Sequence, residues 1–206
     1  MHRSLCGGLF VAAVLALSAS TSAAQETGTP MFKAPYRAFT SHEFGAAFSD
    51  PGEGVNFALE GFYSYGRGGN DFGIRGGIAD PDGPGDTRIL LGGDFRARVL
   101  SYSESFPLDG ALTVGAGINI GDGDDLVYLP VGITLGRRFE LENSKTTFTP
   151  YVHPTLVPVL GAAGGDDVGF SLGLGVDMRL GQNWAARVSG GIGDLEGVGI
   201  ALTYVQ

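Results

Sequence analysis

The sequence predicts an all-β protein, an antiparallel up-and-down transmembrane β-barrel of ten strands, with eight strands as the alternative if the first short strands are peripheral. Apolar and polar residues alternate along most of the chain after residue 40, which is the period of a strand with two different faces. Glycine accounts for 36 of 206 residues, and only 17% of residues are charged. After residue 25 no apolar run approaches the ~18 residues of a spanning helix, so a membrane-spanning form of this chain would be a closed barrel.

The first 24 residues predict export. Arg3 is followed by an apolar run over 9–17 and by small residues up to a cleavage position before Gln25, which is the three-part pattern of a signal peptide. The only cysteine is Cys6, so the mature chain would have neither a disulfide framework nor a cysteine metal site. We therefore expect a signal peptide over 1–24, a periplasmic lead-in over 25–40 and the barrel over 41–206.

Short turns separate the alternating segments, so successive strands should pair as antiparallel hairpins. The alternation is clearest from Val168 to Leu180, where large apolar residues alternate with glycine, serine, aspartate and arginine. Several segments exceed the five or six residues that are usual in soluble sandwiches. The expected strands are 41–49, 55–66, 72–79, 87–101, 110–121, 126–140, 147–160, 168–180, 184–193 and 197–205.

Every second turn is acidic. These five turns hold 12 of the 22 acidic residues and no lysine or arginine, so they should face the cell exterior if the chain starts in the periplasm. Crowded carboxylates attract hard divalent cations. The candidate ligands do not complete a calcium-binding loop, so we expect diffuse attraction of cations and no cofactor; they are Asp122, Asp124, Asp125, Asp166 and Asp167.

The faces expected to point inward carry charges of both signs. In a narrow barrel these side chains would fill the lumen as ion pairs, whereas in a wider one they would line a pore with a positive bias. The predicted lumen network consists of Glu60, Arg75, Arg88, Asp94, Arg96, Arg98, Arg138, Asp177, Arg179 and Arg187.

Four prolines predict a weak seam between strands six and seven. Pro150, Pro154 and Pro158 are four residues apart, so their missing N–H donors lie on one side of the strand. A hairpin turn centred near Ser144 would set Pro130 opposite Pro158. If their missing donors face each other, the ladder is open there and forms a lateral gap; a register shift of one residue reverses that result.

Little in the sequence indicates catalysis. His42 and His153 are the histidines that remain after the predicted cleavage, and neither has the neighbouring serine pattern or clustered acids of membrane-embedded hydrolases. We expect His153 to be a polar strand residue near an interface. The sequence therefore predicts a protein that is not an enzyme.

The C-terminal strand carries the most specific motif. Gly199, Leu202 and Tyr204 are similar to the C-terminal assembly signal of small bacterial outer-membrane β-barrel proteins, although Val205 and Gln206 extend past the aromatic residue. The turn from Gly181 to Trp184 also resembles a periplasmic hairpin of that family. The resemblance implies a bacterial outer-membrane location, with outer-membrane lipid and the barrel assembly machinery as partners.

These observations leave two main functions open, with a membrane-embedded lipid-modifying enzyme as a third hypothesis. One is a non-enzymatic barrel with short acidic outer loops and a structural or surface-interaction role. The alternative is a transport barrel, either a small pore or a lateral conduit for apolar solutes through the proline-weakened seam. The formal net charge of −9 argues against nucleic acid as a partner, and we expect a monomer.

Overall fold

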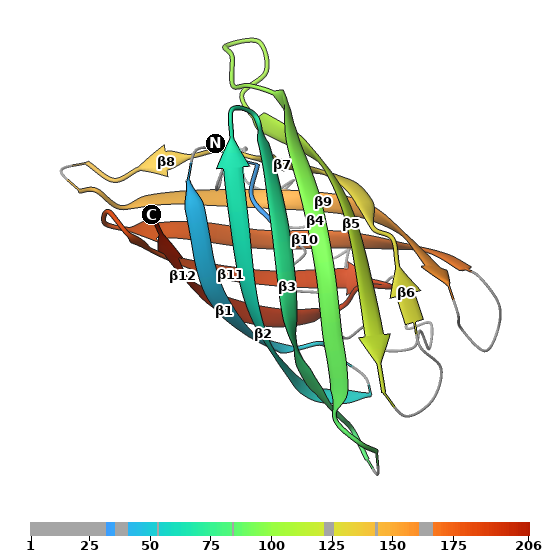
Figure 1. Cartoon of the computed structure of the whole chain (residues 1–206). Coiled ribbons are helices and arrows are strands. Elements are labelled where there is room, and N and C mark those ends of the chain that lie inside the picture. Colours follow the sequence, from blue (N-terminus) through green and yellow to red (C-terminus); the bar gives the residue numbers. More distant parts are fainter. Residues whose placement is uncertain are drawn as a thin grey trace, which may run out of the picture.

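The computed structural model is an all-β closed barrel in which every strand pairs with antiparallel neighbours (Figure 1). It describes residues 32–35, 41–52, 54–83, 85–121, 126–142, 144–160 and 167–206. The predicted signal peptide, residues 25–31 and 36–40 of the predicted lead-in, and Asp122, Asp124, Asp125 and Asp166 lie outside these ranges. In the described part of the chain, no helix is long and apolar enough to cross a membrane.

Twelve strand segments make ten barrel strands, because β6, β7 and β8 follow one another along the same edge of β9. The pairing of β9 with β10 and of β12 with β1 closes the ring. The strands are β1 His42–Asp50, β2 Val55–Arg67, β3 Asn70–Pro81, β4 Arg88–Leu100, β5 Asp109–Ile120, β6 Leu126–Tyr128, β7 Val131–Gly136, β8 Phe139–Glu140, β9 Thr147–Leu160, β10 Asp167–Leu180, β11 Trp184–Gly193 and β12 Gly197–Val205.

The ten-strand prediction is confirmed, and the ranges agree to within two residues except in strand six. The predicted strand over 126–140 is interrupted at Leu129–Pro130 and again at Arg137–Arg138. Pro130 has no N–H to donate, and Arg137 lies opposite Pro150, which has none either. Missing donors therefore explain both interruptions.

The outward faces of the strands form an apolar surface. Ile74, Ile200 and Phe170 are each more than half exposed, which fits side chains that meet lipid in a barrel of this kind. Aromatic rings pair across neighbouring strands at the end of the barrel that holds Ser41 and Gln206, which we call the terminal end. These pairs are Trp184–Tyr204, Phe44–Tyr63, Phe72–Phe95 and Phe139–Phe148.

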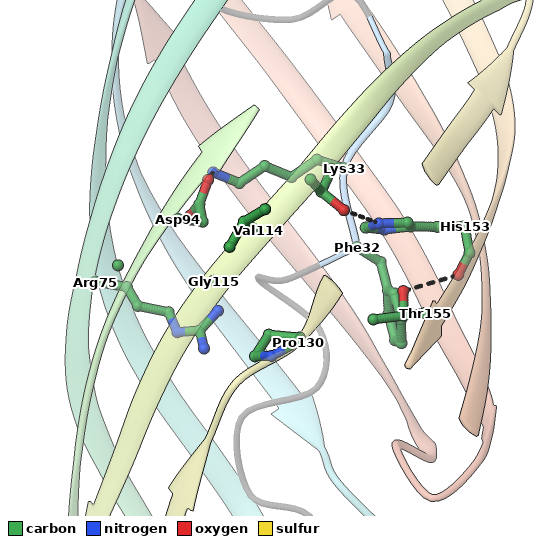
Figure 2. Close-up of a pocket in the computed structure, with 11 residues that line it drawn as sticks. Phe32, Lys33, Arg75, Asp94, Val114, Gly115, Pro130, His153 and Thr155 are labelled. Carbon is green, nitrogen blue, oxygen red and sulfur yellow. Dashed lines mark hydrogen bonds and ion pairs between the residues drawn. The ribbon is translucent and has the colours of Figure 1, made fainter. Parts of the chain in front are cut away.

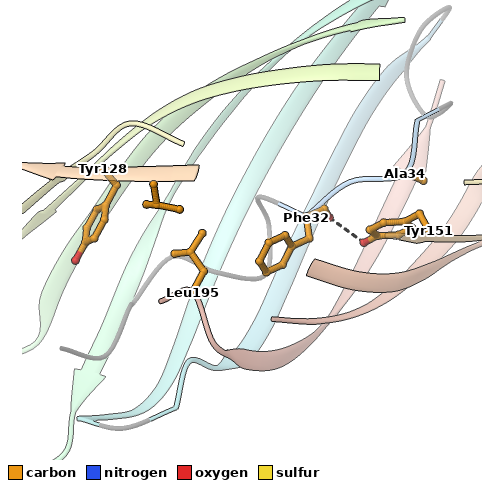
Figure 3. Packing of buried hydrophobic residues seen from close by; sticks show 6 residues of the cluster. Phe32, Ala34, Tyr128, Tyr151 and Leu195 are labelled. Carbon is orange, nitrogen blue, oxygen red and sulfur yellow. Dashed lines mark hydrogen bonds between the residues drawn. The ribbon is translucent and has the colours of Figure 1, made fainter. Parts of the chain in front are cut away.

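The described part of the predicted lead-in lies inside the barrel rather than below it. Phe32 and Ala34 are 1% exposed, and Phe32 packs in a buried cluster with Tyr151 and Leu195 (Figure 3). We call residues 32–35 the inner segment. The expectation of a periplasmic lead-in is thus corrected for these four residues, because side chains of the barrel interior surround them.

The turn between β11 and β12 also folds inward. Its sequence, Asp194–Leu195–Glu196, is one of the five acidic turns predicted to face the cell exterior, yet Leu195 is fully buried. The Leu195 N–H donates to the Ser171 hydroxyl of β10. Leu195 therefore covers the inner segment from the end with the acidic turns, which we call the acidic end.

Candidate functional site

Three consecutive carbonyls of the inner segment are bound by three different strands. The Tyr151 hydroxyl of β9 donates to the Phe32 carbonyl at 2.9 Å, and the Thr134 hydroxyl of β7 donates to the Lys33 carbonyl at 2.6 Å. The Arg96 guanidinium of β4 donates to the Ala34 carbonyl. An extended segment that pairs with no strand thus has its acceptors satisfied by side chains, as a buried backbone requires.

Lys33 extends from the inner segment to the opposite wall (Figure 2). Its ammonium lies 2.8 and 2.6 Å from the two carboxylate oxygens of Asp94 in β4 and 3.5 Å from the Ser64 hydroxyl of β2. The Lys33 side chain is 7% exposed and that of Asp94 is 18% exposed. Partial burial strengthens this charge-assisted contact relative to a surface pair.

Glycines of the wall make room for the inner segment. A Cβ atom added to Gly173 would lie 2.1 Å from the Phe32 ring, and one added to Gly191 would lie 2.8 Å from it. A Cβ atom on Gly73 would lie 2.8 Å from the Lys33 ammonium. At Gly173 the three nearest atoms all belong to Phe32, so this position needs glycine as long as the segment occupies the lumen. At Gly191 and Gly73 the nearest atoms are the Leu195 carbonyl oxygen at 2.0 Å and an Asp94 carboxylate oxygen at 2.6 Å, so the segment is not the sole constraint there.

Further ion pairs fill the lumen. Arg96 binds both carboxylate oxygens of Asp71, and Arg187 binds Asp177 at 2.7 Å. Arg75 lies 3.6 Å from Glu60. Of the predicted network, Glu60, Arg75, Asp94, Arg96, Asp177 and Arg187 thus take part in lumen ion pairs.

The other four predicted lumen arginines are placed differently. Arg88 is half-buried near the acidic end, whereas Arg98, Arg138 and Arg179 are exposed near the terminal end. Arg179 donates to the Gln182 carbonyl of the next turn at 2.6 Å. The alternation predicts which face of the sheet a side chain is on, but not how far along the barrel axis it lies. Arginines near the strand ends were therefore predicted as lumen residues.

His153 lies in the barrel interior and not near an interface, which corrects the expectation from sequence. It is 2% exposed, its Nε2 is 2.7 Å from the Thr113 hydroxyl, and its ring meets the Phe32 ring edge-on at 5.8 Å. A cavity of about 20 Å³ adjoins it, enough for roughly one water molecule. Lys33, Asp94 and Pro130 also line this cavity (Figure 2).

The proline seam differs from its prediction by one residue of register. Val131 lies opposite Leu156, and the Leu129 N–H donates to the Pro158 carbonyl at 2.9 Å. Pro130 instead faces β5, where its carbonyl accepts the Gly115 N–H at 2.8 Å. The prediction that Pro130 and Pro158 oppose each other is therefore wrong, and the ladder continues on both sides of Pro130.

The three prolines of β9 do share one side, as their spacing predicts. The Pro158 and Pro150 carbonyls accept bonds from Leu129 and Arg137, so this side faces β6, β7 and β8. Because proline has no N–H, none of the three can donate a bond in return. The seam is thus weakened at three positions but is not open.

The acidic turns show local roles for several carboxylates. Asp50 accepts the Gly52 N–H, Asp80 accepts the Asn56 amide, and Asp194 accepts the Phe170 N–H. Among the residues that the structure describes, no three histidine, cysteine or acidic side chains gather as a metal site. Asp167 begins β10, and Asp122, Asp124, Asp125 and Asp166 lie outside the described residues, so the cation prediction stays a prediction.

Sequence reasoning missed Phe32, Lys33, Asp71 and Tyr151 as lumen residues. Residues 32–35 show no strand alternation, and Asp71 was assigned to a turn although it lies in β3. The available signal was the inward glycine at 173, where an added Cβ atom would meet the Phe32 ring before any atom of the barrel wall.

A family model matches most of the chain. The outer membrane protein beta-barrel domain matches residues 9–200. Among solved structures, a chain described as "De novo design of transmembrane beta-barrels" is 17% identical, covers 85% of this chain and 99% of its own, and has a TM-score of 0.41. A search of curated proteins finds no match. The matched domain spans nearly the whole sequence, and its description as a β-barrel agrees with the barrel of this structure, so this chain belongs to the outer membrane protein beta-barrel domain family of the bacterial outer membrane.

Proposed function

We propose that this protein is a sealed, non-enzymatic barrel with a structural or surface-interaction role in the outer membrane. The proposal rests on the way in which the inner segment is held inside the barrel. Side chains of the barrel strands bind three of its carbonyls and the Lys33 ammonium. Buried ion pairs fill much of the remaining interior, and the β11–β12 turn covers the segment at the acidic end. The other four acidic turns would then be the surface offered to partners and to lipid headgroups.

Planar-bilayer recording tests the proposal. The purified full-length protein should insert without step conductance, because on this proposal the inner segment and the ion pairs block the lumen. Heat-modifiable gel migration of the same sample shows that the inserted protein is a folded barrel. Reproducible conductance steps from a heat-modifiable sample would reject the sealed role and favour a small pore.

A transport role is the second candidate. It is favoured by the break at Leu129–Pro130, since Pro130 lines the lumen cavity and the prolines of β9 weaken the adjoining ladder. An apolar solute could leave the lumen sideways where this wall is weakest. The bonds from Leu129 to Pro158 and from Gly115 to Pro130 count against an open gap in the resting barrel.

Restoring the missing donors separates the two roles. The triple variant Pro150→Ala, Pro154→Ala, Pro158→Ala would regain three N–H groups toward β6, β7 and β8. If the barrel is a lateral conduit, proteoliposomes with this variant should take up a long-chain fatty acid more slowly than those with the unmodified barrel, because the seam is strengthened. Pro51→Ala, in the β1–β2 turn, is the matched control. The sealed role predicts no protein-dependent uptake by any of the three proteins.

A further inference from the structure

The inner segment is bound as a ligand is bound, by side chains that converge on it from several strands. We propose that the barrel interior is a binding site for an extended peptide in which an aromatic residue is followed directly by lysine. Residues 32–34 of this chain are its exchangeable resident occupant. The inference goes beyond the proposed structural role, because a barrel with an exchangeable occupant can also hold a second peptide of the same chemistry.

The main-chain part of the site accepts any extended segment. Tyr151, Thr134 and Arg96 supply donors to three successive carbonyls, and they come from β9, β7 and β4. Such hydrogen bonds to carbonyls fix the direction and register of a peptide without contacting its side chains.

Two subsites supply selectivity. The first is the carboxylate of Asp94 with the Ser64 hydroxyl, where the Lys33 ammonium is bound and Gly73 leaves space for it. A primary ammonium donates up to three hydrogen bonds and therefore suits this set of acceptors.

The second subsite holds the aromatic ring. Gly173 and Gly191 leave the ring its volume, and His153 meets it edge-on at 5.8 Å and 82°. Leu195 closes the pocket from the acidic end and is fully buried in the same cluster. A phenylalanine therefore fits where a β-branched or charged side chain would leave contacts unmade.

The contacts of the inner segment bear on its release and on its replacement. Among the described residues, no backbone-to-backbone hydrogen bond joins residues 32–35 to a strand, so release breaks only side-chain contacts. Release would also leave Asp94 without its lysine and would remove the Ala34 carbonyl from the buried Arg96 guanidinium. Arg96 keeps its ion pair with Asp71, whereas the Asp94 carboxylate loses the ammonium that it binds. A mostly buried carboxylate without its ammonium is costly, so an emptied site favours a new occupant of matching chemistry.

Binding in trans tests the inference. The full-length variant Phe32→Ala, Lys33→Ala keeps the barrel and weakens the resident occupant. A fluorescent, end-blocked peptide of residues 29–37 (TPMFKAPYR) should bind it saturably in detergent micelles, as followed by fluorescence anisotropy. Affinity should fall about tenfold or more when the peptide carries Lys33→Gln, or when the barrel variant also carries Asp94→Asn. The barrel with its native segment should bind more weakly than the variant, because its own residues compete.

Saturable binding that does not depend on Lys33 of the peptide or on Asp94 of the barrel would overturn the inference. So would the absence of binding to a heat-modifiable sample of the variant at peptide concentrations up to about 1 mM.

A second measurement avoids the double variant altogether. Ala34→Cys places one thiol on the buried inner segment of a chain whose only natural cysteine lies in the predicted signal peptide. Excess TPMFKAPYR should speed maleimide labelling of this thiol with a saturating dependence on concentration, since the peptide occupies the site when the segment leaves. The same peptide with Phe32 and Lys33 interchanged is the control. Equal labelling rates with both peptides would overturn the inference.

Discussion

Phe32 lies directly against Gly173 of β10, so close that a Cβ atom at residue 173 would fall 2.1 Å from the ring. Gly173→Ala should therefore displace the ring or strain β10. We expect a loss of about 1–3 kcal/mol in the free energy of unfolding, the usual cost of overpacking a filled interior. Urea unfolding in micelles, followed by the loss of heat-modifiable migration, measures it.

The matched control for this substitution is Gly61→Ala. Gly61 lies on the outward face of β2, where an added Cβ atom would meet only two backbone oxygens at 4.0 Å. This variant should unfold like the unmodified protein. Equal losses at both positions would mean that glycine matters there for sheet curvature and not for the inner segment.

The Lys33–Asp94 contact should show strong coupling. Lys33→Ala leaves a mostly buried carboxylate without its ammonium, which we expect to cost about 2–4 kcal/mol. Adding Asp94→Ala should recover part of that loss, because the uncompensated charge is then gone. A double-mutant cycle of unfolding free energies should give a coupling of about 1–3 kcal/mol, and simple additivity would contradict the contact.

The outward face of β10 should be sensitive to charge according to depth. Leu174 lies near the middle of the strand and is 41% exposed, whereas Val168 lies at its acidic end and is 64% exposed. Leu174→Arg should cost about 2–4 kcal/mol, and Val168→Arg about 0–1 kcal/mol. Unfolding from lipid vesicles measures both. Equal costs would argue that residue 174 does not lie at the bilayer midplane.

Engineered disulfides test the register of the proline seam. Leu129 and Pro158 are a directly opposed pair on the outward face, so Leu129→Cys with Pro158→Cys should oxidise readily. Pro130→Cys with Pro158→Cys should not, because Pro130 is buried on the inward face. The bond shows as altered migration on a non-reducing gel, and preferential oxidation of the second pair would restore the predicted lateral gap.

The strands could be predicted from the sequence because each has one face toward lipid and one toward the lumen, which imposes strict alternation. The residue pairing across the proline seam could not be predicted, since it depends on whether the turn before β9 is centred at Ser144 or half a residue earlier. Leu141 and Thr146 are bonded across that turn in the earlier register. A shift of one residue changes which residues lie opposite each other and which faces they are on. The geometry of this turn, and not the spacing of the prolines, therefore determines whether Pro130 lies opposite Pro158.

The inner segment could not be placed from the sequence for a different reason. Its position depends on contacts with residues far along the chain, and no local pattern reports them. Gly173 is a residue whose identity reflects the segment, because a Cβ atom there would meet the Phe32 ring first. At Gly136 a Cβ atom would lie 3.0 Å from Pro35 but nearer still, at 2.7 Å, to the Pro150 carbonyl oxygen. The sequence showed the need for space inside the barrel without showing what fills it.

The bonds of the inner segment also constrain how the protein folds. They join residues separated along the chain by 119, 101 and 62 positions, and their donors lie on three strands that must first stand in one wall. Contacts of such long range form slowly, because each requires a large loop to close. Burial of Phe32 should therefore be among the last events of refolding, at the same time as β1 joins β12 or after it, although Phe32 precedes every strand that the structure describes.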